Sequence, residues 1–148
     1  MALNVFEQMG YKLGYKKDSY DNRDYVHMLP LVMPDMPDKI DLRDKIKTIF
    51  KQSYSDCSAN VICNNIMSLK DDNNVVSSLF TYYNSRFVQD PVFITDNGTT
   101  YRDALKGLQK FGFVYESEYD YIDEHLNNCP NDNIYECGEK NKYIVMLL

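Results

Sequence analysis

Apolar residues between positions 59 and 69 recur every three or four places, and this spacing constrains the fold most strongly. A helix places such residues on one face, and the set is Ala59, Ile62, Cys63, Ile66 and Met67, with Val61 and Leu69 widening it. Ser55 or Asp56 can cap the start of this helix, which puts Cys57 in its first turn. The polar run at 70–74 ends it.

Two further helices follow from the same kind of pattern. Ser77 or Ser78 begins one that runs to about Phe87. A turn at 96–98 leads to another, which Thr99 or Thr100 caps and Gly112 ends. We expect 113–148 to be irregular, broken at Pro130 and Gly138, and to close on a strand at 142–145.

The flanking segments set the domain organisation. Residues 1–38 hold little periodic hydrophobicity, and Pro30, Pro34 and Pro37 favour extended backbone, so we expect an N-terminal arm that lies across a surface. Residues 39–148 would form a single helical unit. The predicted fold class is therefore α+β and mainly α, with an extended N-terminal arm.

Length and charge exclude several classes of function. The 148 residues suit one domain with a sizeable core. A formal net charge of −6 argues against nucleic-acid binding, because phosphate backbones require a basic face. No apolar run approaches the roughly 20 residues that cross a bilayer, and the first residues do not resemble a signal peptide, so we expect a soluble protein in the cytoplasm or in a protein assembly.

The four cysteines are expected to be free thiols. A chain without a secretion signal favours free thiols over a disulfide framework, and the spacing of Cys129 and Cys137 is not that of a zinc site. We therefore expect no metal and no cofactor.

Cys57 has the strongest chemical potential in the sequence. The positive end of a helix stabilises a thiolate, which is the nucleophilic form of cysteine. Gln52, five residues earlier, could donate its side-chain amide to an oxyanion together with the backbone N–H of Cys57. A cysteine near a helix start is more often a packing residue or an inert thiol.

A series of motifs, in one order along the chain, decides between these interpretations. In order they are Gly14-Tyr15, Asn22-Arg23-Asp24-Tyr25, Asp41-Leu42-Arg43, Gln52 before Asp56-Cys57-Ser58-Ala59-Asn60, Ser77 to Arg86, Asp96-Asn97-Gly98 with Arg102, and Gly112 to Glu116 with Tyr119-Asp120-Tyr121. This order resembles the papain-like cysteine peptidases, in particular their divergent branch with an N-terminal arm. The resemblance covers roughly residues 14 to 130.

The resemblance implies a papain-like left, helical lobe with a central Cys-bearing helix. By position, Cys57 would be the nucleophile and Gln52 the oxyanion donor. The catalytic His and Asn of the family lie in a β-barrel lobe, and we expect the chain to end where that lobe would begin, without a complete β barrel. His27 and His125 do not occupy the position of the family's base, so neither receives a catalytic role.

The loop before Cys57 departs from the family pattern. Gln52 stands one residue too close to Cys57, Ser53 and Ser55 replace glycines, and Asp56 places a carboxylate next to the thiol. A neighbouring negative charge opposes the thiolate. Arg43, Arg86 and Arg102 match family positions, and we expect them to pair with Asp41, Asp96 or Asp103 and so pin the arm and loop.

Three functional interpretations remain open. The chain could be an inactive lobe kept as a protein-binding or structural module, with a partner or a second copy on its exposed face, for example in a large assembly. It could be an active thiol peptidase, completed by a partner chain or dimer that supplies the His base. It could also be a truncated copy without a settled role.

Overall fold

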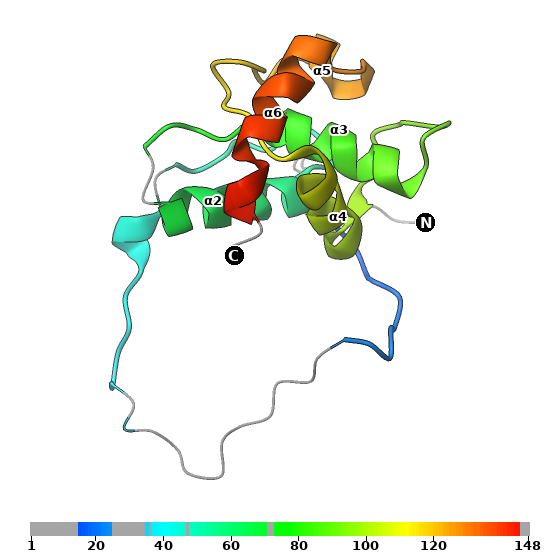
Figure 1. Cartoon of the computed structure of the whole chain (residues 1–148). Coiled ribbons are helices and arrows are strands. Elements are labelled where there is room, and N and C mark those ends of the chain that lie inside the picture. The colour runs from blue at the N-terminus through cyan, green and yellow to red at the C-terminus, as the bar shows by residue number, and fades with distance from the viewer. Residues whose placement is uncertain (1–14, 25–34, 36, 47, 71–72, 146–148) are drawn as a thin grey trace.

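The computed structural model describes residues 15–24, 35, 37–46, 48–70 and 73–145 (Figure 1). Its elements are β1 (Tyr15–Lys16), the 3-10 helix η1 (Arg43–Lys45), α2 (Cys57–Lys70), α3 (Ser78–Gln89), β2 (Thr99–Thr100), α4 (Tyr101–Phe111), α5 (Asp123–Asn127) and α6 (Asp132–Val145). The described chain is therefore mainly helical, as the sequence predicts.

The three predicted helices are confirmed, and so are the side-chain caps of α3 and α4. α2 starts at Cys57, and the carbonyl of Asp56 accepts its first helical hydrogen bond, from the N–H of Asn60 at 3.0 Å. The Ser77 hydroxyl caps α3 by accepting from the Phe80 N–H at 3.2 Å. Thr100 caps α4, and Gly112 ends that helix at a positive φ of 70° that glycine adopts without strain.

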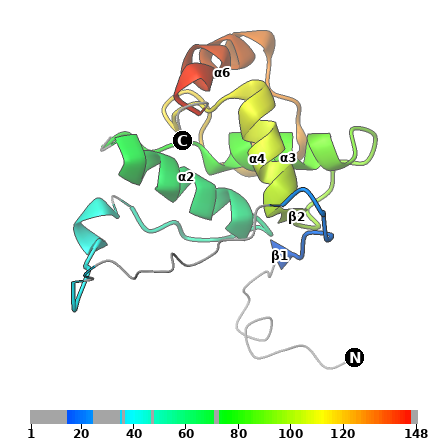
Figure 2. The same cartoon turned by 60° about the horizontal axis from the view of Figure 1, so that its bottom comes forward.

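The prediction for the C-terminal part was wrong, because 142–145 is helical and belongs to α6. Asn131 starts α6 by accepting the Ile134 N–H on both its backbone and its side-chain oxygen, each at 3.1 Å. Gly138 does not break this helix. A Cβ there would lie 2.4 Å from the Phe111 carbonyl oxygen, so the missing side chain lets α6 pack against the end of α4 (Figure 2).

α3 is the most enclosed helix. All its residues from Ser78 to Arg86 are buried, with α2 and α4 packed against it. Two clusters of buried side chains form the core: Ile62, Cys63, Ile66, Met67, Val76, Ala104, Leu108 and Phe113 in one, and Tyr54, Ala59, Leu79, Phe80, Tyr82, Val114 and Tyr119 in the other. α2 contributes to both clusters with one face only, which leaves its other face for a separate role.

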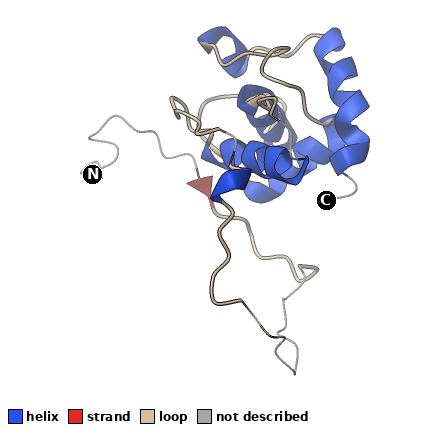
Figure 3. Ribbon diagram, turned by 90° about the vertical axis from the view of Figure 1, so that its left-hand side faces the viewer, coloured by secondary structure: helices blue, strands red, loops and turns tan. Residues whose placement is uncertain are grey.

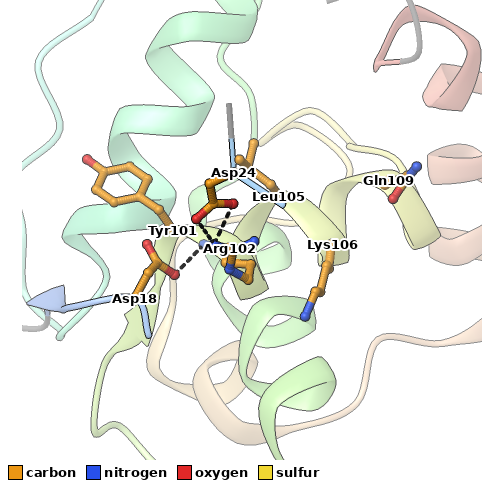
Figure 4. A pocket seen from close by; sticks show the side chains of 7 residues that line it. All are labelled: Asp18, Asp24, Tyr101, Arg102, Leu105, Lys106 and Gln109. Carbon is orange, nitrogen blue, oxygen red and sulfur yellow. Dashed lines mark hydrogen bonds and ion pairs between the residues drawn. The ribbon is translucent and has the colours of Figure 1, made fainter. Parts of the chain in front are cut away.

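Much of the predicted arm, at 1–14, 25–34 and 36, lies outside the described residues. Its described part begins at β1, which pairs in parallel with β2 beside the start of α4 (Figures 2 and 3). Asp18 accepts from the Arg102 backbone N–H at 3.0 Å, and Asp24 accepts from the Arg102 guanidinium at 2.7 Å (Figure 4). These bonds tie residues 15–24 to α4.

The three motif arginines have different partners. Arg43 donates to Asp41 at 2.8 Å, as predicted. Arg102 binds Asp24, and its guanidinium also lies 3.8 Å from Asp21, so it pairs with the arm rather than with the predicted aspartates.

The prediction for Arg86 was wrong. Its buried guanidinium donates to the Leu126 carbonyl and to the Asn127 side chain, and it lies 3.9 Å from the centre of the Tyr82 ring. Arg86 therefore connects α3 to α5, an element absent from the prediction.

Candidate active site

Cys57 and Gln52 line one surface hollow of about 290 Å³. Helix α2 forms one wall of this hollow, and the segment that precedes the helix forms the other. The lining residues are Ile46, Thr48, Ile49, Phe50, Gln52, Cys57, Asn60, Val61 and Asn64. Cys57 is half-buried and its thiol is free. The fold therefore places the Cys57 thiol at a helix N-terminus, in the same hollow as the Gln52 side chain.

Gln52 is held within its own loop. Its Nε2 donates to the Tyr54 carbonyl oxygen at 2.9 Å. An oxyanion donor must direct an N–H at the reacting carbonyl oxygen. One of the two N–H bonds of this amide instead stabilises the turn before Cys57, so Gln52 also has a structural role.

No histidine among the described residues lines the hollow. His125 lies on α5, where its Nδ1 is 2.9 Å from Asp120 and its ring stacks on Tyr119 with 4.0 Å between centroids. His27 lies outside the described residues. The described chain therefore places no imidazole beside Cys57 to act as its base.

Asp56, immediately before Cys57, is completely buried. Its Oδ2 accepts from the Tyr121 hydroxyl at 2.9 Å, while Oδ1 has no hydrogen-bond partner. Burial raises the pKa of this carboxyl to about 6, against the lowering effect of the Tyr121 hydrogen bond. The sequence shows an acidic residue beside the thiol, but it does not show this burial.

Three tyrosine–aspartate pairs surround the loop before Cys57. Besides Tyr121–Asp56, Tyr82 donates to Asp96 at 2.9 Å and Tyr54 donates to Asp123. Two of these groups also bind the loop backbone: Asp96 accepts the Ser55 N–H at 2.8 Å and the Tyr121 hydroxyl oxygen accepts the Ser53 N–H at 3.2 Å. Side chains from distant segments thus fix the loop before Cys57.

Apolar side chains are exposed along one side of α2 and the segment before it. We call this the outer face of α2, and it comprises Ile40, Leu42, Ile46, Ile49, Val61 and Leu69. Ile49 is 91% exposed and Leu69 is 63% exposed. A second hollow, of about 740 Å³, lies on this face between η1 and the end of α2, and Ile46 lines both hollows.

Other classes of site find no support in the described residues. They contain no group of three or more His, Cys, Asp or Glu side chains that could hold a metal ion, and all four cysteines are free. None of the described helices combines the length and the apolar character that a membrane crossing requires.

Comparison of the structure with solved structures finds a similar protein. It is xylellain, a cysteine protease from Xylella fastidiosa, with 27% sequence identity and a TM-score of 0.76. The match covers 90% of this chain and 56% of that chain, so the chain spans little more than half the length of its neighbour. No protein-family model and no curated protein sequence matches.

The structural neighbour is a papain-like cysteine protease, and the described chain has the helical-lobe architecture that the motif series predicts.

Proposed function

We propose that the chain is a papain-like cysteine peptidase homologue that is proteolytically inactive alone and acts as a protein-binding module through the outer face of α2. The fold match to a cysteine protease supports the homology. The observation that carries the rest is the hollow at Cys57, which combines a nucleophile position with an apolar wall and has no described base.

Peptide hydrolysis by a thiol requires a proton acceptor. The sulfur attacks the peptide carbonyl carbon, the C–N bond breaks, and the departing amine takes up a proton from the conjugate acid of the base. Water then hydrolyses the thioester. Removing a catalytic set costs on the order of 10⁶ in rate, so a Cys57 without a base would not sustain turnover.

The binding role rests on the exposed apolar side chains. Isolated apolar residues on a surface are ordinary, but a contiguous apolar patch beside a hollow is typical of an interface. In the proposed organisation, residues 1–38 are an arm and residues 39–148 are the lobe, and a protein partner or a second copy covers the outer face. The hydrogen bonds of Arg102 to Asp18 and Asp24 hold residues 15–24 against α4.

A charge placed on the outer face tests the proposal. Val61→Asp and Leu69→Asp add carboxylates at positions that are 42% and 63% exposed. Substitutions at such exposed positions should change the stability of the fold little. Sedimentation velocity over a wide concentration range should show association of the wild type and loss of it in both variants. Cys57→Ala, the matched control, should associate like the wild type.

A wild type that stays monomeric over the whole concentration range would contradict self-association. The binding surface itself would be contradicted if both aspartate variants bound a purified partner as tightly as the wild type. Loss of association in Cys57→Ala alone would indicate that the interface lies at the Cys57 thiol and not on the outer face of α2.

A second candidate function is an active thiol peptidase completed by a partner chain or dimer that supplies the His base. The shared hollow of Cys57 and Gln52 supports it, because a thiol and an amide side chain line the same hollow. Such an enzyme would hydrolyse a peptide substrate only with its partner present, and the activity would disappear in Cys57→Ala.

A further inference from the structure

We infer that residues 48–51, the segment beside the hollow at Cys57, bind an extended acidic segment of a partner protein as an added β-strand. This inference rests on the proposed function and deepens it, because it names the kind of partner that covers part of the outer face of α2. In strand addition, hydrogen bonds between the two main chains supply affinity, and side chains supply selectivity.

The first argument is the extended course of the chain before α2. Residues 48–53 belong to no helix, strand or turn of the fold, and the segment runs beside α2 in an open course (Figure 2). Their exposure alternates: Thr48, Phe50 and Gln52 are half-buried, and the three residues between and after them are exposed. A period of two is that of an extended strand with one face toward the protein.

The second argument is that both ends of this segment are held while its middle is unpaired. At one end the Lys45 carbonyl oxygen accepts from the Ser68 hydroxyl at 2.8 Å, and at the other the Ser53 N–H donates to the Tyr121 hydroxyl oxygen at 3.2 Å. Within the described part of the chain, residues 48–51 form no backbone–backbone hydrogen bond. An extended backbone with unpaired N–H and C=O groups is an edge on which a second strand can form.

The third argument is charge. The described residues at 39–46 and 48–51 include four Lys or Arg and two Asp, in a chain whose formal net charge is −6. The exposed Lys51 forms no ion pair with another described residue. The segment is therefore locally basic on an acidic protein, and this charge favours an acidic strand over a basic one.

The two faces of the segment define which strand fits it. The exposed face carries Lys51, so an acidic residue on the same face of the added strand pairs with it. The other face lies toward the hollow at Cys57, whose walls include the apolar side chains of Ile46 and Val61. The partner segment therefore has acidic residues at alternate positions and apolar residues between them.

The first test is a titration of the full chain with a fluorescently labelled peptide, an acetylated and amidated Val-Glu repeat of four units, followed by fluorescence anisotropy. The peptide should bind saturably, and a Val-Lys repeat of the same length should bind about tenfold more weakly or less. Lys51→Glu should weaken the binding of Val-Glu about three- to tenfold and strengthen the binding of Val-Lys by a similar factor. The matched control is Lys110→Glu, at an exposed lysine of α4 that lines neither hollow, and it should leave both affinities unchanged.

The second test distinguishes main-chain pairing from side-chain contact. Alternate N–H groups of a strand point to opposite edges, so pairing along one edge protects every second amide. When about nine-tenths of the chain is bound to the Val-Glu peptide, NMR-detected hydrogen exchange should slow about five- to tenfold at two alternate amides within 48–51, because exchange then proceeds through the free fraction. The other two amides should exchange as in the free chain.

Failure of saturable Val-Glu binding would overturn the inference, and so would binding without slower exchange at 48–51. Equal affinities of wild type and Lys51→Glu for both peptides would overturn the acidic selectivity. Protection of 48–51 in the chain alone, growing with its concentration, would make a second copy the occupant and overturn the acidic peptide.

The inference and the proposed function fail in different ways. Leu69 lines the second hollow but not the one at Cys57, so Leu69→Asp should abolish association with a partner while changing the affinity for the Val-Glu peptide less than about twofold. A chain whose association is lost in Leu69→Asp but which binds no peptide would retain the proposed function without the added strand. A chain that binds the peptide but whose association is insensitive to Leu69→Asp would contradict the outer face of α2 instead.

Discussion

The two faces of α2 differ in how far their apolar side chains are buried. On the inner face, Ile62, Cys63, Ile66 and Met67 are at most 4% exposed and pack against the rest of the lobe. On the outer face, Val61 and Leu69 remain 42% and 63% exposed. One helix thus carries both core residues and exposed apolar residues, and Cys57 is its first residue.

The sharpest contrast between the faces should appear in thiol reactivity. Cys63 is fully buried, and burial raises its pKa to about 12, so it reacts only when the protein opens. Cys57 is half-exposed and reacts in the folded state. Peptide mapping after iodoacetamide treatment should find Cys57 modified more than about 10³ times faster than Cys63. Comparable rates would mean that α2 opens readily.

A matched pair of truncations should show the same contrast in stability. Ile66→Ala removes a core side chain that is 2% exposed and should lower the free energy of unfolding by about 2 to 5 kcal/mol. Leu69→Ala, three residues later on the exposed side, should change it by less than about 0.5 kcal/mol. Urea denaturation measures both values, and equal losses would contradict the assignment of the faces.

The start of α2 should make stability depend on pH. The folded-state pKa of Asp56, about 6, lies above its ordinary value of 3.8, so between these values the folded chain binds more protons than the unfolded chain. Stability then falls as pH rises through this window, by up to about 3 kcal/mol from this group. Asp56→Asn should remove that loss, so its advantage over wild type in urea denaturation should grow from about pH 4 to about pH 6.5. An advantage that stays constant would contradict this.

The smallest of these effects concerns a cap inside the lobe. Ser77→Ala deletes the hydroxyl that caps α3 and donates to the Tyr119 carbonyl at 2.6 Å, and it should cost about 1 to 2 kcal/mol. Thr100→Ala at the half-buried start of α4 offers a matched cap and should cost about 1 kcal/mol or less. Thermal unfolding would contradict the ranking if Thr100→Ala were the more damaging change.

Local signals in the sequence predict α2, α3 and α4 because periodicity and capping residues lie within each helix. The errors arise where distant contacts decide the structure. Gly138 has the signature of a break, yet it is helical because Phe111, far away in the sequence, packs on its open side.

The candidate site divides in the same way. The place of Cys57 at the start of α2 could be predicted from the periodic helix that follows it. The burial of Asp56 could not, because its partner Tyr121 is 65 residues away and no periodic pattern joins them. The same holds for Tyr54 and Asp123, which are 69 residues apart.

The most direct test of the central claim is site-resolved labelling with a peptidyl epoxide of the kind that inactivates papain-like enzymes, at neutral pH. Iodoacetamide labelling of the same protein gives the reference reactivity of each cysteine. If the lobe has no base of its own, the ratio of Cys57 to Cys129 labelling should be the same for the two reagents. Fast modification of Cys57 by the epoxide alone, lost in Cys57→Ala, would contradict the claim and make the chain an active thiol peptidase.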